Sequence, residues 1–270
     1  MKKIISKTAV YVVLTFFAVV FAAPLVYAVY YSFTLPENLG TIYPLSEFTT
    51  FFYQVLFAKY PVIQWFLNSV VVMLCVVVAN VFITIMAGYA LARIDFKGRN
   101  FIFFIFTSTM MIPDQLLLAP QYVQLVNYGW HNTLISVIVP FLCFPFFVYL
   151  SRQFILSIPY ELEEAARVDG EGRIYTFFSV ILPNTKNLMI TIVIICVSWV
   201  WNSYLAPATF INDRMKYTLV VGFNTIKDMT FDSVNFRMAT VVLLSLPVAT
   251  VFLVLQKYFI KGIAASGIKG

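Results

Sequence analysis

Charged residues are scarce in this chain of 270 residues. Asp, Glu, Lys and Arg make up 11% of the sequence, whereas 61% of it is apolar; soluble domains carry about 25% charged residues. Twelve acidic and eighteen basic side chains are too few to cover a soluble globule of this size with solvated groups. The composition excludes an ordinary soluble domain and indicates a membrane protein.

Histidine and cysteine are also rare. The sequence has one histidine, His131, and three cysteines, Cys75, Cys143 and Cys196, each in a separate apolar run. A zinc or haem site needs closely spaced ligands of these types, and a Ser–His–Asp triad needs a histidine beside an activated serine. Phosphate-binding G-x-x-x-x-G-K-[ST] and G-x-G-x-x-G motifs are absent as well. We therefore expect no catalytic residue, no metal and no cofactor bound by this chain.

Long charge-free runs are what the chain has instead. A helix needs about 20 apolar residues to cross a hydrocarbon layer of about 30 Å, and five runs are long enough, with a sixth, shorter block between them. The sequence predicts an all-α polytopic membrane protein with one domain over residues 1–270. The six predicted transmembrane helices lie near residues 9–34, 63–91, 101–119, 134–150, 184–205 and 238–258.

The first run raises the alternative of a cleaved signal peptide, because Lys2, Lys3 and Lys7 precede it. The apolar core of a signal peptide is about 7–15 residues long. Here the apolar stretch continues without a charge as far as Phe33. We therefore favour an uncleaved helix.

The basic residues set the orientation. If the N-terminus lies inside, most of the eighteen Lys and Arg residues fall in the predicted cytoplasmic segments, as the positive-inside rule requires. Both termini are then predicted to be cytoplasmic. The net charge of +6 is explained by this topology and by contact with anionic membrane lipid, so we expect no nucleic-acid partner.

Ion-coupled carriers usually hold an ionised side chain inside the membrane, because its burial is costly unless it has a role. The five long runs contain none, and Asp114 lies at the edge of a predicted span, next to Pro113. Two roles stay open for Asp114: a helix end, or the lining of a pathway. The other candidates to line a pathway are Asn68, Gln115, Trp201 and Asn202, for which packing or interhelical hydrogen bonding is the alternative.

The longest predicted cytoplasmic loop, residues 151–183, contains a short helix with clear start and stop signals. Pro159 suits its first position, and acidic side chains follow where they complement the positive end of the helix dipole. Gly170 suits the left-handed residue that ends a helix. Glu163 and Arg167 stand four residues apart, which predicts an ion pair along the helix.

One face of this short helix is small and apolar, so that another surface can approach it closely. The face consists of Leu162, Ala165, Ala166 and Val168. Glu164 beside it can receive a Lys or Arg from a partner. A helix lying flat on lipid is the alternative, but three glutamates would then face an anionic leaflet. We favour docking to a protein whose movement tilts the flanking membrane helices.

The same loop resembles a known motif. Glu164-Ala165-Ala166, three residues, Gly170, nine residues and then residues 180–183 (VILP) resemble the EAA loop of permease subunits of ABC importers, whose usual form is EAA-x3-G-x9-I-x-L-P. Asp169 fits a common variant, and Val180 replaces the usual Ile. Asn68-Ser69, residues 88–93 (GYALAR) and Trp201-Asn202 resemble the MalG-like, carbohydrate-importing branch. The resemblance covers residues from about 9 to 270.

The resemblance implies a type I ABC importer permease fold in the cell (inner) membrane of a bacterium or archaeon. It assigns ATPase coupling to Glu163, Glu164, Ala165, Ala166, Asp169, Gly170, Leu182 and Pro183. It implies a cytoplasmic ABC ATPase, homodimeric or heterodimeric, that holds ATP and Mg. It also implies a second, related permease subunit, an extracytoplasmic solute-binding protein that meets the loop 204–236, and a sugar as the cargo.

Two alternatives stay open. The EAA loop does not report the cargo, so a non-sugar solute such as glycerol phosphate is possible within the same importer class. An ion-coupled carrier is the alternative from another class, although the missing intramembrane charge counts against it. Trp199, Trp201, Tyr204 and Phe210 are able to stack on sugar rings, but Trp and Tyr also form ordinary interface belts, which is the role we favour.

Overall fold

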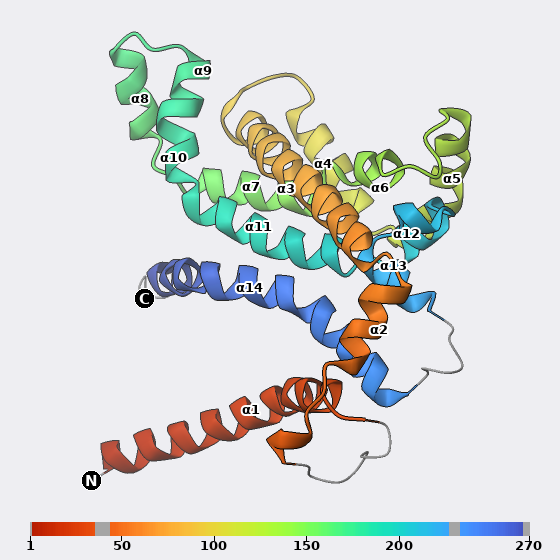
Figure 1. The fold of residues 1–270 in the computed structure, drawn as a ribbon. Coiled ribbons are helices and arrows are strands. Elements are labelled where there is room, and N and C mark those ends of the chain that lie inside the picture. The colour runs from red at the N-terminus through yellow and green to blue at the C-terminus, as the bar shows by residue number, and fades with distance from the viewer. Residues whose placement is uncertain (1, 36–43, 227–232, 267–270) are drawn as a thin grey trace. The chain divides into compact units, whose positions relative to one another are not determined.

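A computed structural model describes residues 2–35, 44–226 and 233–266, and every regular element in these ranges is a helix (Figure 1). The all-α prediction is confirmed. The chain divides into two compact units. Unit 1 comprises residues 1–63 and 223–247, and unit 2 comprises residues 64–222 and 248–270. The prediction of a single domain stays a prediction, and each unit is described by itself.

Four helical stretches among the described residues are long and apolar enough to cross a membrane. They are Lys7–Ser32, Val62–Arg93, Ile135–Leu156 and Val234–Val254. Two further pairs of helices meet the same criteria but are sharply bent, by 101° and 71°. The predicted six spans are reached if each bent pair counts as one span, so the number six and the cytoplasmic termini stay predictions.

Unit 1 is held together by side chains at the end of its first helix. It contains α1 (Lys2–Ser32), η2 (Leu45–Glu47), α2 (Phe51–Lys59) and the beginning of α14 (Val234–Ser266). The buried Asn235 carboxamide donates to the carbonyls of Tyr31 (3.1 Å) and Thr34 (3.0 Å), which lie where α1 ends and where carbonyls run out of α-helical N–H donors. The Tyr53 hydroxyl donates to Ser32 Oγ at 2.8 Å, and burial raises the pKa of Tyr53.

Unit 2 contains most of the remaining helices. They are α3 (Val62–Arg93), α4 (Arg99–Thr109), α5 (Asp114–Asn127), α6 (Ile135–Ile138), η3 (Val139–Phe141), α7 (Pro145–Leu156), α8 (Glu161–Val168), α9 (Arg173–Thr176), η4 (Phe177–Ile181), α10 (Leu182–Asn184), α11 (Lys186–Trp201), α12 (Leu205–Phe210), η5 (Arg214–Lys216) and α13 (Leu219–Asn224). Apolar side chains of α3, α7 and α11, among them Ile85, Phe147 and Ile192, form its fully buried core.

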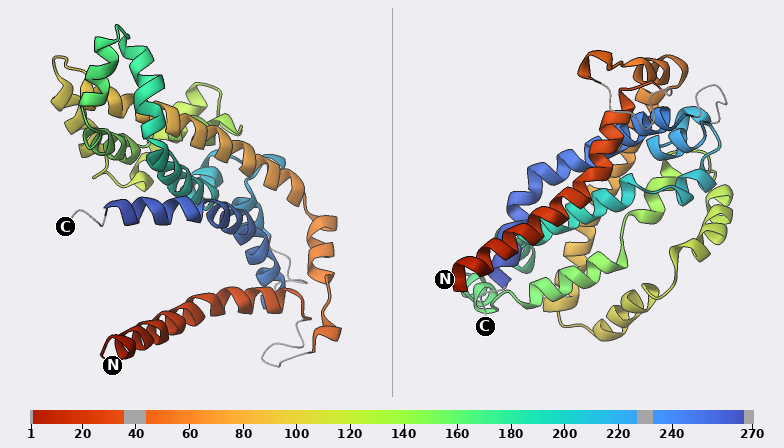
Figure 2. Two further views of the ribbon diagram at one scale, coloured as in Figure 1. Left: turned by 90° about the vertical axis from the view of Figure 1, so that its left-hand side faces the viewer. Right: turned by 90° about the horizontal axis from the view of Figure 1, so that it is seen from below.

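The predicted span 101–119 is not one straight helix. It consists of α4 and α5, which meet at 101° (Figure 2, right). Pro113 stands at the break, where it cannot donate a helical hydrogen bond and disfavours helical backbone at Ile112 before it. Asp114 is consequently the first residue of α5.

The predicted span 134–150 is also interrupted, and it extends further, to Leu156. Its backbone leaves the α-helical course between η3 and α7. There Asn80 of α3 donates to the Phe141 carbonyl at 2.8 Å and accepts from the Phe144 N–H at 2.8 Å. Backbone groups freed inside a membrane must find partners within the protein, and this fully buried amide supplies both. The segment predicted as the loop 151–183 therefore begins inside α7.

Side chains at the beginning of α3 fix the segment around η5. Trp65 Nε1 donates to the Arg214 carbonyl at 2.7 Å. Asn68 Nδ2 donates to the carbonyls of Met215 and Tyr217, each at 2.9 Å. Part of the predicted outer loop 204–236 is thus folded against α3, whereas its residues 227–232 lie outside the described residues.

Helices α3 and α7 approach each other closely at Gly88. A Cβ atom on Gly88 would lie 2.5 Å from Ser151 Cβ and 2.8 Å from the Arg152 backbone nitrogen. Arg152 Nε in turn donates to the Leu91 carbonyl at 3.2 Å. The approach requires a residue without a side chain at this position.

We expect Gly88→Val to destabilise unit 2 by about 1–3 kcal/mol, the usual cost of overpacking. The check is the melting temperature of the purified chain in detergent, followed by tryptophan fluorescence. Gly172→Ala is the matched control, because a Cβ at Gly172 meets no atom within 4 Å. Equal melting temperatures for the two variants would contradict the close packing.

Candidate functional site

Helix α8 and the helical arm Arg173–Asn184 form a hairpin at one end of α11 (Figure 1; Figure 2, left). We call residues 157–184 the elbow. Its turn is at Gly170, whose φ is +84°. The Gly170 N–H donates to the Arg167 carbonyl at 3.0 Å, and the Glu171 N–H donates to the Ala166 carbonyl at 2.9 Å. These bonds form a Schellman motif, which satisfies the last carbonyls of a helix, and they confirm the predicted left-handed turn.

Helix α8 begins later than predicted. The N–H groups of Glu163 and Glu164 both donate to the Tyr160 carbonyl, at 2.9 and 3.1 Å, so the first helical bonds start there. Pro159 therefore precedes the helix instead of occupying its first position. The acidic first turn is present as predicted.

The two faces of α8 differ sharply. Glu163 and Ala166 are buried within the chain. The exposed face carries Leu162, Glu164, Ala165 and Val168. The predicted small apolar face is thus divided, because Ala166 packs inward while the other three members point outward.

Glu163 does not use the predicted ion pair with Arg167. Its Oε1 lies 2.9 Å from Arg93 Nε, and its Oε2 accepts from the Tyr89 hydroxyl at 3.3 Å. The Arg167 guanidinium lies instead over the Tyr160 ring, 5.6 Å from its centroid. A pair along an exposed helix contributes a few tenths of a kcal/mol, whereas a buried carboxylate needs a close counter-charge.

The second arm of the elbow leads into the membrane-type helix α11. It contains a π-helical stretch, η4, followed by Leu182 and Pro183 at the beginning of α10. Pro183 is exposed and Leu182 is half-buried. The chain then bends by 71° into α11. Leu182 and Pro183 therefore lie at the junction between the elbow and a long helix.

Both arms of the elbow expose large apolar side chains. They are Leu162, Val168, Ile174, Tyr175 and Phe178. Val168 is 87% exposed and Ile174 is 77% exposed, although neither lies in a long apolar helix. Large apolar side chains exposed outside the long apolar helices make the elbow a candidate interaction site. Asp169 and Gly170, at the tip, are exposed as well.

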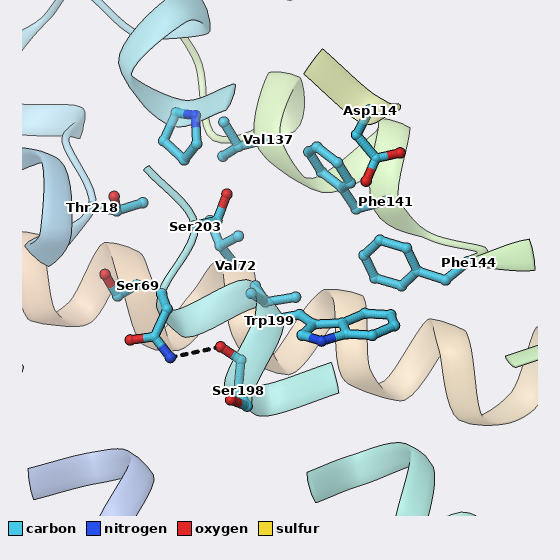
Figure 3. Close-up of a pocket in the computed structure, with 13 residues that line it drawn as sticks. Ser69, Val72, Asp114, Val137, Phe141, Phe144, Ser198, Trp199, Ser203 and Thr218 are labelled. Carbon is cyan, nitrogen blue, oxygen red and sulfur yellow. Dashed lines mark hydrogen bonds between the residues drawn. The ribbon is translucent and has the colours of Figure 1, made fainter. Parts of the chain in front are cut away.

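A pocket of 520 Å³ lies elsewhere in unit 2, between α3, α5, η3 and the end of α11 (Figure 3). Its polar lining includes Asp114, Ser198, Asn202 and Ser203. The Asn202 carboxamide donates to the Ser198 carbonyl at 2.8 Å, the dashed line in Figure 3. A second pocket of 650 Å³ shares Asp114, Asn202 and Ser203 and adds Gln115.

Trp199 forms an aromatic platform at the pocket. Its ring stacks on Phe147, with centroids 5.3 Å apart and planes at 20°. Phe144 meets it edge-on at 5.5 Å. These two ring contacts support one side of the indole. Because Trp199 is still 45% exposed, its other side is accessible to a ligand. Ligand sites typically combine such apolar area with a few polar groups that fix orientation.

Three of the five residues predicted to line a pathway border these pockets, namely Asp114, Gln115 and Asn202. Asp114 begins α5, in agreement with a helix-end role, and its role in lining a pathway stays a prediction. Asn68 and Trp201 do not border either pocket. The Asn68 carboxamide is engaged by backbone carbonyls, and Trp201 is 2% exposed and packs on Phe66.

The structure places Trp199 at the pocket, where the sequence had pointed to Trp201. Both residues belong to α11. Residues of a helix are rotated by about 100° each, so two tryptophans two positions apart face nearly opposite sides. After its first turn, α11 has only Thr191 and Ser198 as polar residues, which is too weak a pattern to predict which side faces the core.

These observations define a polytopic, helical membrane protein with an exposed helical elbow and a separate aromatic pocket. Residues 80–265 match the family model of the binding-protein-dependent transport system inner membrane component, and the chain belongs to this family. The EAA-loop resemblance is thereby confirmed at the level of the family.

Relatives and a solved structure agree with this assignment. The chain is 34% identical over 206 residues to the arabinooligosaccharides transport system permease protein AraQ of Halalkalibacterium halodurans, covering 76% of this chain and 74% of that protein. It is 30% identical over 198 residues to the sn-glycerol-3-phosphate transport system permease protein UgpE of Brucella abortus, covering 73% and 70%. A bacterial ABC transporter involved in the import of the acidic polysaccharide alginate has the same fold, with a TM-score of 0.81 at 22% identity, covering 96% of this chain and 98% of that one.

We expect Gly170→Val to loosen the elbow. A β-branched residue at φ +84° is strained by about 1–2 kcal/mol, and the Schellman bonds weaken with it. Amide hydrogen exchange of residues 161–171 should become faster than in the unaltered chain. Gly172→Val is the matched control, since Gly172 has φ −77° and open space around it; similar exchange in both variants would remove the need for a left-handed turn.

Proposed function

We propose that this chain forms half of the translocation pathway of an ATP-driven, binding-protein-dependent importer for a sugar or oligosaccharide, in the inner membrane of a bacterium. The observation that carries the proposal is the exposed face of the elbow. It combines apolar side chains on both arms with outward carboxylates, among them Glu164 in the middle of the first arm. Such a surface suits a cleft in a soluble partner that supplies a Lys or Arg.

The partner that uses this surface is a cytoplasmic ATPase, as a homodimer or heterodimer, which holds ATP and Mg. The sequence of this chain has no nucleotide-binding motif of its own, so the chain is a transport subunit and not the enzyme. A second, related permease subunit supplies the other half of the pathway. Membership of the family supports this division of labour and disfavours an ion-coupled carrier.

A solute-binding protein delivers the cargo to the opposite side of the membrane. The segment that receives it begins with α12 and includes η5, which Trp65 and Asn68 hold by three hydrogen bonds to its backbone. Asn132 also accepts from the N–H groups of Asn212 and Asp213, at 3.0 and 2.8 Å. A segment fixed at so many points offers a preorganised docking surface.

The pocket supports a sugar as the cargo. The exposed face of Trp199 suits the apolar face of a sugar ring, and the Asp114 carboxylate, with Ser203 and Asn202 nearby, suits its hydroxyl groups. The AraQ relative is named for arabinooligosaccharides. Glycerol phosphate is the second candidate, because UgpE is a relative, but a carboxylate in the pocket repels a phosphate.

The first test is purification of the tagged chain from its native membrane in mild detergent, with mass spectrometry of what accompanies it. We expect an ATPase, a second permease and a binding protein whose solute can be eluted and identified. Glu164→Lys should lose the ATPase and ATP-driven uptake while its level in the membrane stays unchanged, because the variant meets a basic partner with the wrong charge.

Three results would each contradict part of the proposal. An unaltered chain that purifies without any ATPase would refute the importer assignment. Normal uptake by Glu164→Lys would remove Glu164 from the docking contact. A phosphorylated solute in the binding protein would replace the sugar with the second candidate.

The pocket generates a separate prediction. Trp199→Ala should raise the solute concentration for half-maximal uptake, or lower the uptake rate, by about tenfold, equivalent to about 1.4 kcal/mol. Trp199→Phe should retain part of the activity because it keeps a stacking face. Trp130→Ala is the control, since Trp130 is partly exposed and borders neither pocket; equal uptake by Trp199→Ala and this control would exclude the platform from the pathway.

A further inference from the structure

A buried ion pair connects the inner side of the elbow to the last residue of α3. The Glu163 side chain is 1% exposed and the Arg93 side chain is 9% exposed, with Nε and Oε1 2.9 Å apart. The chain offers a contrast at the same end of α3. Asp95 and Arg99 form a looser pair at 3.7 Å, with Asp95 97% exposed.

Arg93 also binds the chain that leads into the elbow. Its Nη2 donates to the Ile155 carbonyl at 2.8 Å and to the Ile158 carbonyl, near the end of α7 and just before α8. Its guanidinium lies 5.4 Å from the centroid of the Tyr160 ring. One side chain of α3 therefore holds the entrance to the elbow as well as its first helix.

Tyr89, one turn earlier in α3, extends the connection to the second arm. Its hydroxyl donates to Glu163 Oε2 at 3.3 Å. Its ring packs against Phe177 of η4, with centroids 5.2 Å apart. The last turns of α3 thus contact both arms of the elbow.

The pair resists separation for an electrostatic reason. Taking two charges out of water is costly, and their attraction repays that cost only while they stay together. If α8 moved away from α3, the 2.9 Å contact would break, and each group would lose its counter-charge before water could reach and solvate it. The elbow is therefore far more easily moved together with α3 than relative to it.

Helix α3 is suited to transmit such a movement. It is continuous over 32 residues, about 48 Å at 1.5 Å per residue. Near its opposite end, Ser69 and Val72 line the pocket, and Asn68 holds the segment around η5.

We propose that Arg93 and Glu163 are positioning residues that lock the elbow to α3, so that displacement of the elbow is delivered through α3 to the pocket. The adjacent glutamates then have distinct tasks: Glu164 meets the partner, and Glu163 transmits its movement. The coupling role rests on the proposed function, whereas the lock itself does not.

The lock is tested by amide hydrogen exchange in the purified native complex, in lipid nanodiscs. Glu163→Gln keeps the shape of the side chain but removes its charge. We expect exchange of residues 159–170 at least tenfold faster than in the unaltered complex. Asp95→Asn, which removes a carboxylate from the exposed pair on the same helix end, should leave that exchange unchanged.

The transmission is tested by the ratio of solute imported to ATP hydrolysed in proteoliposomes. Glu163→Gln should keep the ATPase in the complex and its ATP hydrolysis, while the ratio falls at least fivefold. A loss that merely reflected unfolding would lower uptake and hydrolysis together and leave the ratio unchanged. Asp95→Asn should keep the ratio of the unaltered complex.

If Glu163→Gln does not accumulate in the membrane, the double variant Arg93→Gln with Glu163→Gln replaces it, because no lone buried charge remains. The same faster exchange and lower ratio are expected. Unchanged exchange in the accumulating variant would overturn the lock. Faster exchange with an unchanged ratio would overturn the transmission, and an unaltered complex without ATPase would refute the proposed function while leaving the exchange result valid.

Discussion

Every polar group that enters the apolar interior of this chain must find its partner within the protein, because a membrane offers no water to replace one. The described structure repeatedly meets this constraint with a single side chain placed at a break in the backbone. Asn80 satisfies both sides of the interruption before α7, Asn68 satisfies two carbonyls beside η5, and Asn235 does the same at the end of α1. The backbone is therefore held by the protein itself at each of these three places.

The same constraint separates two neighbouring glutamates. Glu163 turns inward, where Arg93 and Tyr89 compensate its charge, and Glu164 turns outward into solvent. A helix that carries both can be tied to its own chain on one face and bind a partner on the other. The Gly170 turn and the apolar side chains of the second arm complete a compact element whose two sides serve different contacts.

The pocket and the elbow contact opposite ends of α3, and both are needed to explain a transport role. The pocket, with an aromatic ring beside a carboxylate, offers contacts to a solute. The elbow offers a surface to the proposed ATPase partner. Under the proposed function, their connection through one uninterrupted helix is the route by which a subunit without a nucleotide motif takes part in ATP-driven transport. Membership of the binding-protein-dependent transport family provides the setting in which these features operate together.

The sequence by itself determined the helical membrane class, from charge-free runs long enough to cross a bilayer, and the family, from the spacing of Glu164, Gly170 and Pro183. These properties depend on composition and on distance along the chain. Only the tertiary structure decided which side of each helix is inside: that Glu163 pairs with Arg93 and not with Arg167, and that Trp199 and not Trp201 borders the pocket. The physical reason is that α11 is almost entirely apolar and that three glutamates share the first turn of α8. Their sequences therefore do not indicate which tryptophan or which glutamate faces inward, and the choice depends on partners far away in the chain.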